Sequence, residues 1–243
     1  MSIDIKKFSE LVNIMASVGI SQVAFDPNDD GGTLVRASND EKTIIVFDTI
    51  NESFSDKSIG ISKLSALQSR LALFDIDKAS ISFTGSNDWV TDIVIKEGRK
   101  KVTYRCAIPK KINVPKKLAD YTLPSGDPVR ISSEMVSYLT TAVSAISLTG
   151  DKNKRKIGMS CEAGELSIAI EDGESDSFNT VEKAEGVEDF DRHQWNVKAF
   201  TKTLKHCSDL SEEKLASFYV IDEYGFCYFD SHPLSYVIPP EVS

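Results

Sequence analysis

Residues 197–210 read VKAFTKTLKHCSDL, and this stretch has two sides of opposite character. Its apolar residues recur at spacings of three and four, as on one face of a helix: Val197, Phe200, Leu204 and Cys207. A second face, roughly 145° away when each residue turns by about 100°, carries three lysines: Lys198, Lys202 and Lys205. The sequence therefore predicts an amphipathic helix with one buried face and one basic face.

The same unit, one helix followed by about three antiparallel strands, recurs four times along the chain. The other helices are predicted at 5–18, 63–74 and 133–148, and the expected N-caps are Ser62, Ser132 and Asn196. Alternating apolar runs bounded by turn residues predict strands at 22–26, 33–38, 42–49, 79–84, 89–95, 101–107, 156–161, 166–171, 177–181, 215–221, 225–230 and 234–238. Helix starts lie about 60 to 70 residues apart, so we interpret the pattern as a structural repeat.

A proline- and lysine-rich stretch separates the first two units from the last two. Residues 108–128 contain four prolines and four lysines, a composition typical of an extended connector. The predicted fold is α+β, with two similar domains that each pack two helices on antiparallel sheets. The expected boundaries are 1–108 for the first domain, 109–128 for the connector and 129–243 for the second domain.

Composition places the chain among globular proteins without a membrane anchor. It has 243 residues, 41% hydrophobic and 27% charged, and no apolar run of the roughly 18 to 20 residues that cross a bilayer. The N-terminal stretch lacks the apolar segment of a signal peptide. The cysteines are scattered in apolar stretches, without metal-ligand spacing, and we expect free core thiols: Cys106, Cys161, Cys207 and Cys227. We expect a cytoplasmic protein.

The charge is distributed unevenly. The formal net charge is −9, and a simple nucleic-acid binder is usually basic. Acidic residues concentrate in loops such as 26–30 and 171–191, whereas basic residues gather on helix faces and in one loop. The basic candidates are Lys6, Lys63, Arg70, Lys152, Lys154, Arg155, Lys198, Lys202 and Lys205. Such segregation suits a protein that holds a polyanion against its helices, although charges opposite an apolar stripe can also be merely solvated. The third helix has hydroxyl residues and no lysine.

No motif of a known catalytic, nucleotide-binding or metal site occurs in the sequence. The three histidines, His193, His206 and His232, stand apart from one another and belong to no recognisable nucleophile motif, and we expect neither enzymatic activity nor a cofactor or metal. Asp26, Asn28, Asp30 and Gly31 match the start of a calcium-binding loop. Its twelfth position should be a bidentate glutamate and is Ala37 here, so we interpret this stretch as a hairpin turn.

Two segments carry a resemblance to a known family. Thr43-Ile44-Ile45-Val46-Phe47-Asp48 with Ile59-Gly60-Ile61-Ser62-Lys63-Leu64, and the ending from Gly225-Phe226-Cys227-Tyr228-Phe229-Asp230 to Tyr236-Val237-Ile238-Pro239-Pro240, are similar to segments of DNA polymerase sliding clamps. The resemblance extends over the whole chain. The sliding clamp family includes proliferating cell nuclear antigen and the T-even phage clamp.

The resemblance implies a homotrimeric ring of six domains, with twelve helices around the hole and sheets outside. The basic residues on the helices would then face duplex DNA without reading its sequence. A clamp tethers a DNA polymerase, is opened by a clamp loader, and in phages can couple to late transcription.

The resemblance also implies two protein-binding surfaces. A partner pocket beside the connector and the C-terminal tail would comprise Leu118, Tyr121, Leu123, Tyr236, Ile238 and Pro239. The subunit interface would pair the edge strands 101–107 and 177–181, with Thr103, Tyr104, Phe178 and Thr180. Two alternatives remain: a non-ring single-strand binding or scaffold protein, for which Tyr104 beside Arg105 is the one faint sign, and an enzyme with an unrecognised site.

Overall fold

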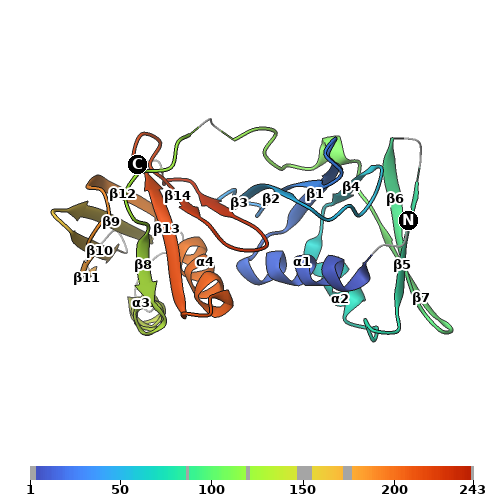
Figure 1. The fold of residues 1–243 in the computed structure, drawn as a ribbon. Helices are drawn as coiled ribbons and strands as arrows, with labels where there is room; N and C mark the ends of the chain where they lie inside the picture. The colour runs from blue at the N-terminus through green and yellow to red at the C-terminus, as the bar shows by residue number, and fades with distance from the viewer. Residues whose placement is uncertain (1–3, 86–87, 119–120, 147–154, 172–176, 242–243) are drawn as a thin grey trace. The chain divides into compact units, whose positions relative to one another are not determined.

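The structure is a computed structural model that describes residues 4–85, 88–118, 121–146, 155–171 and 177–241. The chain divides into two compact units, Met1–Leu118 and Ala119–Ser243, so the division falls within the predicted connector. Both units combine helices with antiparallel sheet, which confirms the predicted α+β class (Figure 1). No helix of the described residues is long and apolar enough to cross a membrane.

The first unit packs two helices against one sheet. Its elements are α1 Ile5–Val18, β1 Gln22–Pro27, β2 Thr33–Ser38, β3 Ile45–Ile50, β4 Ser58–Ile61, α2 Leu64–Leu71, β5 Ser80–Gly85, β6 Trp89–Glu97, β7 Lys100–Arg105 and the 3-10 turn η1 Pro109–Lys111. The strand order is β5-β6-β4-β1-β2-β3, and β7 also pairs with β6. The pair β4–β6 is parallel, and the other pairs of this unit are antiparallel. Helices α1 and α2 lie on the same side of β1 and β2 (Figure 1).

Helix α1 is fixed at both ends by its sequence. The carboxylate of Asp4 accepts hydrogen bonds from the backbone N–H groups of Lys6 and Lys7, and Gly19 ends the helix in the left-handed region at φ 96°. The buried face joins an aromatic cluster in which Phe8 lies 5.3 Å from Phe54, between ring centroids. This cluster anchors the helix to the sheet.

The second unit builds two sheets around its own pair of helices. Its elements are β8 Val129–Ser132, α3 Ser133–Ile146, β9 Lys156–Glu162, β10 Glu165–Glu171, β11 Ser177–Lys183, β12 Phe190–Asn196, α4 Val197–Leu210, β13 Leu215–Ile221, β14 Phe226–Phe229 and β15 Tyr236–Ile238. One sheet has the order β15-β14-β13-β8 and the other β11-β10-β9-β12. Trp195 and Phe200 stack at 5.5 Å in the core, both fully buried.

The helix predictions hold with one change of length. Helices α1 and α4 have the predicted bounds, and α2 is shorter than the predicted 63–74. Helix α3 covers Ser133–Ile146, and the last two residues of its predicted range lie outside the described residues. Asn196 caps α4 by accepting from the N–H of Ala199, and the hydroxyl of Ser132 accepts from Met135 N–H. The prediction of Ser62 as a cap is wrong, because the N-cap of α2 is Lys63, which has no side-chain cap bond.

The repeating unit has more strands than the sequence predicted. Strand β4 leads into α2 and lies in the segment 59–64 that carries the family resemblance, whereas β8 and β12 were not among the predicted strands. In β4, a Cβ on Gly60 would lie 2.5 Å from the carbonyl oxygen of Ala107, so only glycine permits this approach. The stretch 27–32 is the turn between β1 and β2, as expected. Cys161, Cys207 and Cys227 are buried free thiols, also as expected.

Candidate functional site

Each unit exposes one side of a helix pair. Helix α1 packs beside α2, and α3 beside α4. In the second unit, Lys198, Lys202 and Lys205 are all exposed on the outer face of α4, while Phe200 and Leu204 are fully buried on the inner face. The ammonium group of Lys205 lies 2.8 Å from the carboxylate of Asp209 one turn away. The sequence therefore positions the three lysines by burying the opposite face of their helix.

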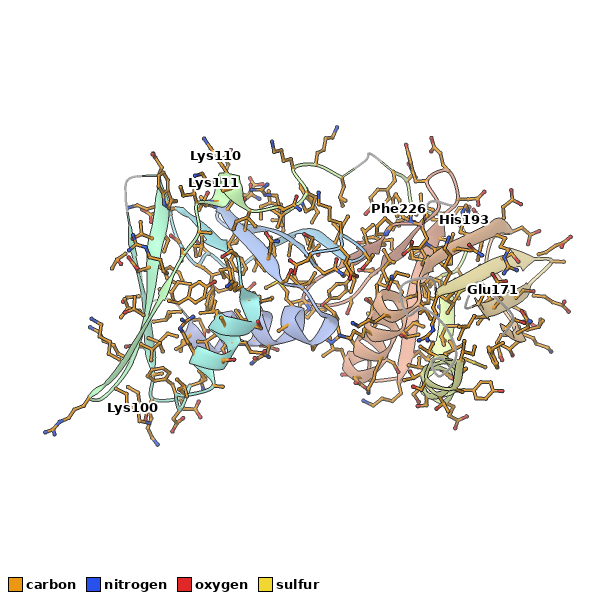
Figure 2. All side chains as sticks on the ribbon, turned by 180° about the vertical axis from the view of Figure 1, so that it is seen from behind. Lys100, Lys110, Lys111, Glu171, His193 and Phe226 are labelled. Atoms are coloured by element: carbon orange, nitrogen blue, oxygen red, sulfur yellow. The ribbon has the colours of Figure 1, made fainter. Side chains whose placement is uncertain are left out.

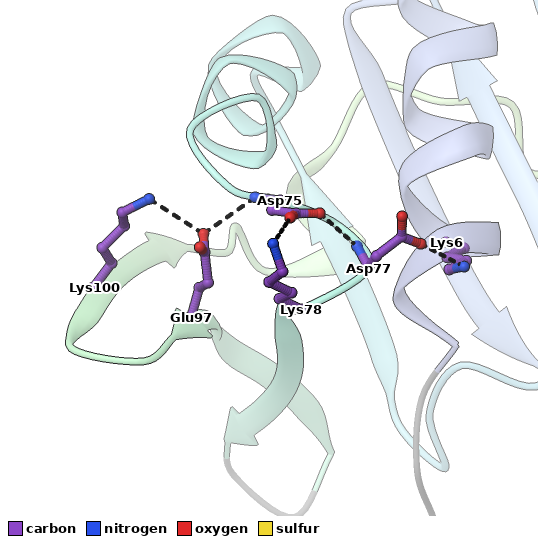
Figure 3. Close-up of polar contacts among 6 residues, drawn as sticks. All are labelled: Lys6, Asp75, Asp77, Lys78, Glu97 and Lys100. Carbon is purple, nitrogen blue, oxygen red and sulfur yellow. Dashed lines mark hydrogen bonds and ion pairs between the residues drawn. The ribbon is translucent and has the colours of Figure 1, made fainter.

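The basic groups of the first unit are more constrained. Figure 3 shows a chain of polar contacts that includes Lys6 and Asp77. Lys6 Nζ and Asp77 Oδ1 are 2.5 Å apart. The hydrogen bond with Asp77 and its charge raise the pKa of Lys6 above the ordinary value. Lys63 is exposed at the N-cap of α2. Arg70 is half-buried, with its guanidinium carbon 5.0 Å from the ring centre of Tyr104.

The predicted basic loop after α3 is only partly within the structure. Lys152 and Lys154 lie outside the described residues. Arg155 is 4% exposed, so its position differs from the solvent-facing one that was expected. A guanidinium held in the interior of the unit is shielded from a surface polyanion, and we withdraw Arg155 from the basic face.

Helix α3 presents hydroxyl groups instead of cations. Thr140, Thr141 and Ser144 are exposed, and each hydroxyl donates to the backbone carbonyl four residues earlier, at 2.8, 2.9 and 3.0 Å. Their hydrogens are used within the helix, and the oxygen lone pairs face outward. The predicted contrast between α3 and α4 is present in the structure.

A cavity of about 400 Å³ opens in the second unit. Three segments form it: the chain leading into β8, the stretch before β12, and the end of β13 with the turn that follows. The lining residues are Tyr121, Thr122, Pro124, Asp127, Val129, Val187, Glu188, Asp189, Phe190, Tyr219, Val220, Ile221, Asp222 and Glu223. Sequence reasoning found only Tyr121, because no local pattern links segments about 30 to 100 residues apart.

The other residues of the predicted partner pocket lie differently. Tyr236 and Ile238 are 0% exposed, so they belong to the core of the unit and cannot line an open pocket. Burial also raises the pKa of Tyr236, whose hydroxyl lies 3.1 Å from His206 Nε2. Leu123 is 40% exposed, and Leu118 and Pro239 are half-buried. For Tyr236 and Ile238 the prediction is wrong. An alternating apolar strand next to a tail has the same sequence pattern whether its side chains line a pocket or fill a core.

The two strands predicted as subunit edges are edge strands within their units. Strand β7 pairs with β6 and β11 with β10 among the described residues. Thr103 is exposed, and Phe178 and Thr180 are half-buried. Tyr104 is 3% exposed and its side chain points into the unit, so it is not an outward contact residue.

Large apolar side chains are exposed on both units. Leu73, just after α2, is 62% exposed, and Val181 on β11 is 59% exposed. Tyr138 on α3 is 53% exposed and its ring meets that of Phe178 at 5.1 Å. Exposed apolar groups next to an unpaired strand edge are typical of surfaces that bind another protein.

No protein-family model and no curated protein matches the sequence. Solved structures match the fold closely. The DNA polymerase III subunit beta from Pseudomonas aeruginosa aligns with a TM-score of 0.70 at 14% identity, over 100% of this chain and 66% of that one. The beta sliding clamp of C. crescentus gives 0.69 at 12% identity, over 100% and 65%.

The chain has the fold of a sliding clamp. The PCNA of Entamoeba histolytica aligns with a TM-score of 0.63 at 18% identity, over 97% of this chain and 95% of that one. This chain therefore spans slightly less than two thirds of the bacterial beta clamps but nearly all of that PCNA. The sliding-clamp fold agrees with the predicted α+β fold of two similar clamp domains.

Proposed function

We propose that this protein is a DNA sliding clamp, a ring of identical chains that encircles duplex DNA and tethers a DNA polymerase. The observation that carries the proposal is the basic face of α4, exposed on a helix of the sliding-clamp fold. A clamp needs loose contacts to phosphates and none to base edges, because it must move along any sequence. Lys198, Lys202 and Lys63 are exposed long-chain cations suited to such contacts.

The number of chains in the ring is proposed to be three. A PCNA chain of nearly the same length as this one supports a two-domain subunit, and clamps of that kind form trimers of six domains. The exposed edges of β7 and β11, together with the exposed side chains of Leu73 and Val181, would join successive copies head to tail. Such an interface buries apolar groups that are exposed in the single chain.

We also propose protein partners and a cellular location for this clamp. The structure of A. fulgidus PCNA bound to the C-terminal region of FEN-1 supports peptide segments of DNA-processing proteins as partners. A clamp loader would open the ring. Because the sequence resembles T-even phage clamps, we also propose that the protein acts in phage replication in the host cytoplasm and has a role in late transcription. The clamp acts by linkage around DNA and needs no catalytic group or cofactor.

The single-strand binding alternative is not favoured. It requires aromatic rings interleaved with cations on an exposed strand face. The pair proposed from the sequence was Tyr104 beside Arg105, and Tyr104 is buried. Its ring therefore cannot stack on a nucleic-acid base.

Two measurements test the proposal. Light scattering at several concentrations should give a mass near three times 26.8 kDa. After loading, the protein should remain on a nicked circular plasmid in salt that abolishes simple phosphate binding, and should be lost once the plasmid is linearised. A strict monomer at high micromolar concentration, or equal retention on circular and linear DNA, would remove the ring.

A further inference from the structure

The hairpin formed by β6 and β7 ends in a basic tip. Residues 96–101 read KEGRKK, and a two-residue turn joins the strands, with Gly98 in the left-handed region at φ 56°. The tip projects from the first unit (Figure 1), and Lys100 lies at its far end (Figure 2). Four cations are exposed there: Lys96, Arg99, Lys100 and Lys101. None of them lies on a helix, so they were not among the basic residues expected to face DNA.

Two of these lysines face each other across the hairpin. In the antiparallel register of β6 and β7, Lys96 is paired with Lys101. Directly opposite residues point to the same face, with Cβ atoms about 4.5 to 5.5 Å apart. The next pair, Ile95 with Val102, points to the other face, where Ile95 is buried. Like charges at directly opposite positions destabilise a hairpin, so this pair costs stability in the free protein.

The neighbouring positions on this face do not offset the repulsion. On β5, the residue paired with Lys96 is Ser80. The next pair along the hairpin that points to the same face is Val94 with Thr103. All three neighbours are uncharged, so the face around the lysine pair supplies no anion.

The described ion pairs leave the repulsion in place as well. Lys100 Nζ lies 3.3 Å from Glu97 Oε2, but this pair occupies the opposite face of the hairpin, next in register to Lys96 and Lys101. Among the described residues, Lys96, Arg99 and Lys101 take part in no ion pair. A cost that the surrounding fold does not offset is typical of a site that serves a function, and here the missing group is an anion.

A chain of contacts connects the tip with the start of the first helix. Glu97, which contacts Lys100, accepts a hydrogen bond from the N–H of Asp75 at 3.1 Å. Asp75 Oδ1 accepts from the N–H of Asp77 at 3.2 Å, and Asp77 pairs with Lys6. Figure 3 shows the whole chain. The tip is therefore linked, through three acidic residues, to a lysine of the predicted DNA-facing set.

We propose that the tip of the β6–β7 hairpin binds the phosphate backbone of duplex DNA, in addition to the helix faces. The inference rests on the proposed clamp function for its ligand and adds a second structural element that contacts it. A two-stranded ribbon is narrow enough to enter the major groove, and lysine and arginine bind phosphates without reading sequence. Bound phosphates offset the repulsion between Lys96 and Lys101.

Two features favour DNA over a protein partner at the tip. Residues 96–101 contain no aliphatic or aromatic residue, whereas protein interfaces are centred on apolar, aromatic or arginine anchors in packed pockets. Pairing of the β7 edge with another copy would use backbone groups in the plane of the sheet. Such pairing leaves the two faces of the hairpin, and the side chains on them, open to DNA.

The first test measures the salt dependence of duplex binding by the full-length protein. The tip variant carries three substitutions: Lys96→Gln, Arg99→Gln and Lys101→Gln. The control variant removes three charges at exposed positions of the connector: Lys110→Gln, Lys111→Gln and Lys116→Gln. In titrations of a short labelled duplex, the slope of log K against log salt should fall by about 2 to 3 in the tip variant and stay unchanged in the control. Equal falls in both variants would mean that DNA responds only to net charge, and would overturn the proposal.

A charge reversal tests the lysine pair itself. Lys101→Glu gives Lys96 an opposite charge to face, so the Tm without DNA should rise by about 1 to 3 °C. The same variant should bind duplex at low salt at least about fivefold more weakly, because it replaces a cation by an anion. A higher Tm with unchanged DNA affinity would overturn the proposal. A lower Tm would remove the unfavourable pairing on which the proposal depends.

Two further measurements separate the possible failures. The variant Lys198→Gln, Lys202→Gln is titrated in parallel: a lower slope for this variant, with a wild-type slope for the tip variant, refutes the hairpin contact and leaves the clamp function standing. A wild-type protein that neither binds duplex nor stays on circular DNA refutes both. Tighter binding of a labelled oligoglutamate peptide than of duplex, abolished in the tip variant, would assign the tip to an acidic protein segment and overturn the proposal.

Discussion

The guanidinium of Arg70 lies over the ring of Tyr104, 5.0 Å from its centre, so a cation predicted to face DNA is held by a residue predicted to face another subunit. The hydroxyl of Tyr104 also donates to the carbonyl of Lys63 and accepts from its N–H, both at 3.3 Å. One buried tyrosine therefore positions two basic residues at opposite ends of α2. Its role is to organise the helix surface from within.

Replacing Tyr104 should destabilise the first unit. Tyr104→Phe removes the two hydrogen bonds to Lys63 and should lower the free energy of unfolding by about 1 kcal/mol. Tyr104→Leu also removes the ring under Arg70 and should cost about 2 to 4 kcal/mol. Urea unfolding at a fixed protein concentration measures both. A neutral Tyr104→Leu would show that this ring does not support α2.

Removing two lysines of α4 should weaken DNA binding and its salt dependence together. Lys198→Gln with Lys202→Gln should lower the slope of log K against log salt by about 2, since each phosphate contact contributes about 0.9. Titrations of labelled duplex at several salt concentrations measure the slope. The control is Lys110→Gln with Lys111→Gln, whose side chains project from η1 (Figure 2) and are exposed. An equal fall in slope for the control pair would contradict a specific role of α4.

An acidic group at Leu73 should weaken self-association. Leu73→Asp places a charge at a side chain that is 62% exposed in the single chain and that we propose to be covered in the ring. The midpoint of dissociation, measured by light scattering on dilution, should move to a concentration at least about tenfold higher. Leu210→Asp is the matched control, at a leucine that is 45% exposed on α4. Equal shifts for both variants would mean that Leu73 has no particular place in the interface.

The pair Asp26–Arg36 should stabilise the first hairpin. Arg36 donates from Nε and Nη2 to Asp26 Oδ2 at 2.9 and 2.6 Å, and Ser58 donates to Oδ1 at 2.7 Å. Both side chains are about one fifth exposed, so Asp26→Asn should cost about 1 to 3 kcal/mol by urea unfolding. Asp48→Asn provides a control at an aspartate of the same sheet. Added Ca²⁺ should leave the Tm of the wild type unchanged, and a rise in Tm would revive the calcium-loop interpretation.

The stability of the protein should fall as the pH drops below about 6.5, in part because of His206. Burial lowers the pKa of this imidazole, with Asp209 opposing the shift, and Tyr236 lies against its Nε2. The unfolded chain therefore binds a proton at higher pH than the folded chain does, and acid favours unfolding. The free energy of unfolding should decline less steeply between pH 7.5 and 5.5 in His206→Gln. An unchanged slope would place the acid sensitivity elsewhere.

The sequence predicted best the elements whose apolar residues all face one interior. Helix α4 has its predicted bounds because Val197, Phe200 and Leu204 recur in helical register and are all buried. Strand β12 escaped prediction because it reads Phe-Asp-Arg-His-Gln-Trp-Asn and contains a register shift between Phe190 and His193. A bulge breaks the period of two on which strand prediction depends.

The candidate sites were predictable where one helix carries the whole pattern. The lysine face of α4 follows from residue spacing alone. The position of the Arg70 side chain instead depends on its contact with Tyr104, which lies 34 residues further along the chain. Tyr236 and Ile238 could not be distinguished from surface residues by composition, because burial is a property of the packed unit. The cavity required three distant segments to meet, and no local period encodes such a meeting.

The hydroxyl hydrogens of Thr140, Thr141 and Ser144 are all directed back into α3. A phosphate passing over these three residues would meet oxygen lone pairs and methyl groups, because their hydroxyl hydrogens are already bonded within the helix. In a closed ring, such a face would surround the DNA without binding it. The free energy of the clamp would then vary little with its position along the duplex. In the proposed ring, the helix without cations would thus reduce translational friction, while the lysines of α4 would keep the ring centred.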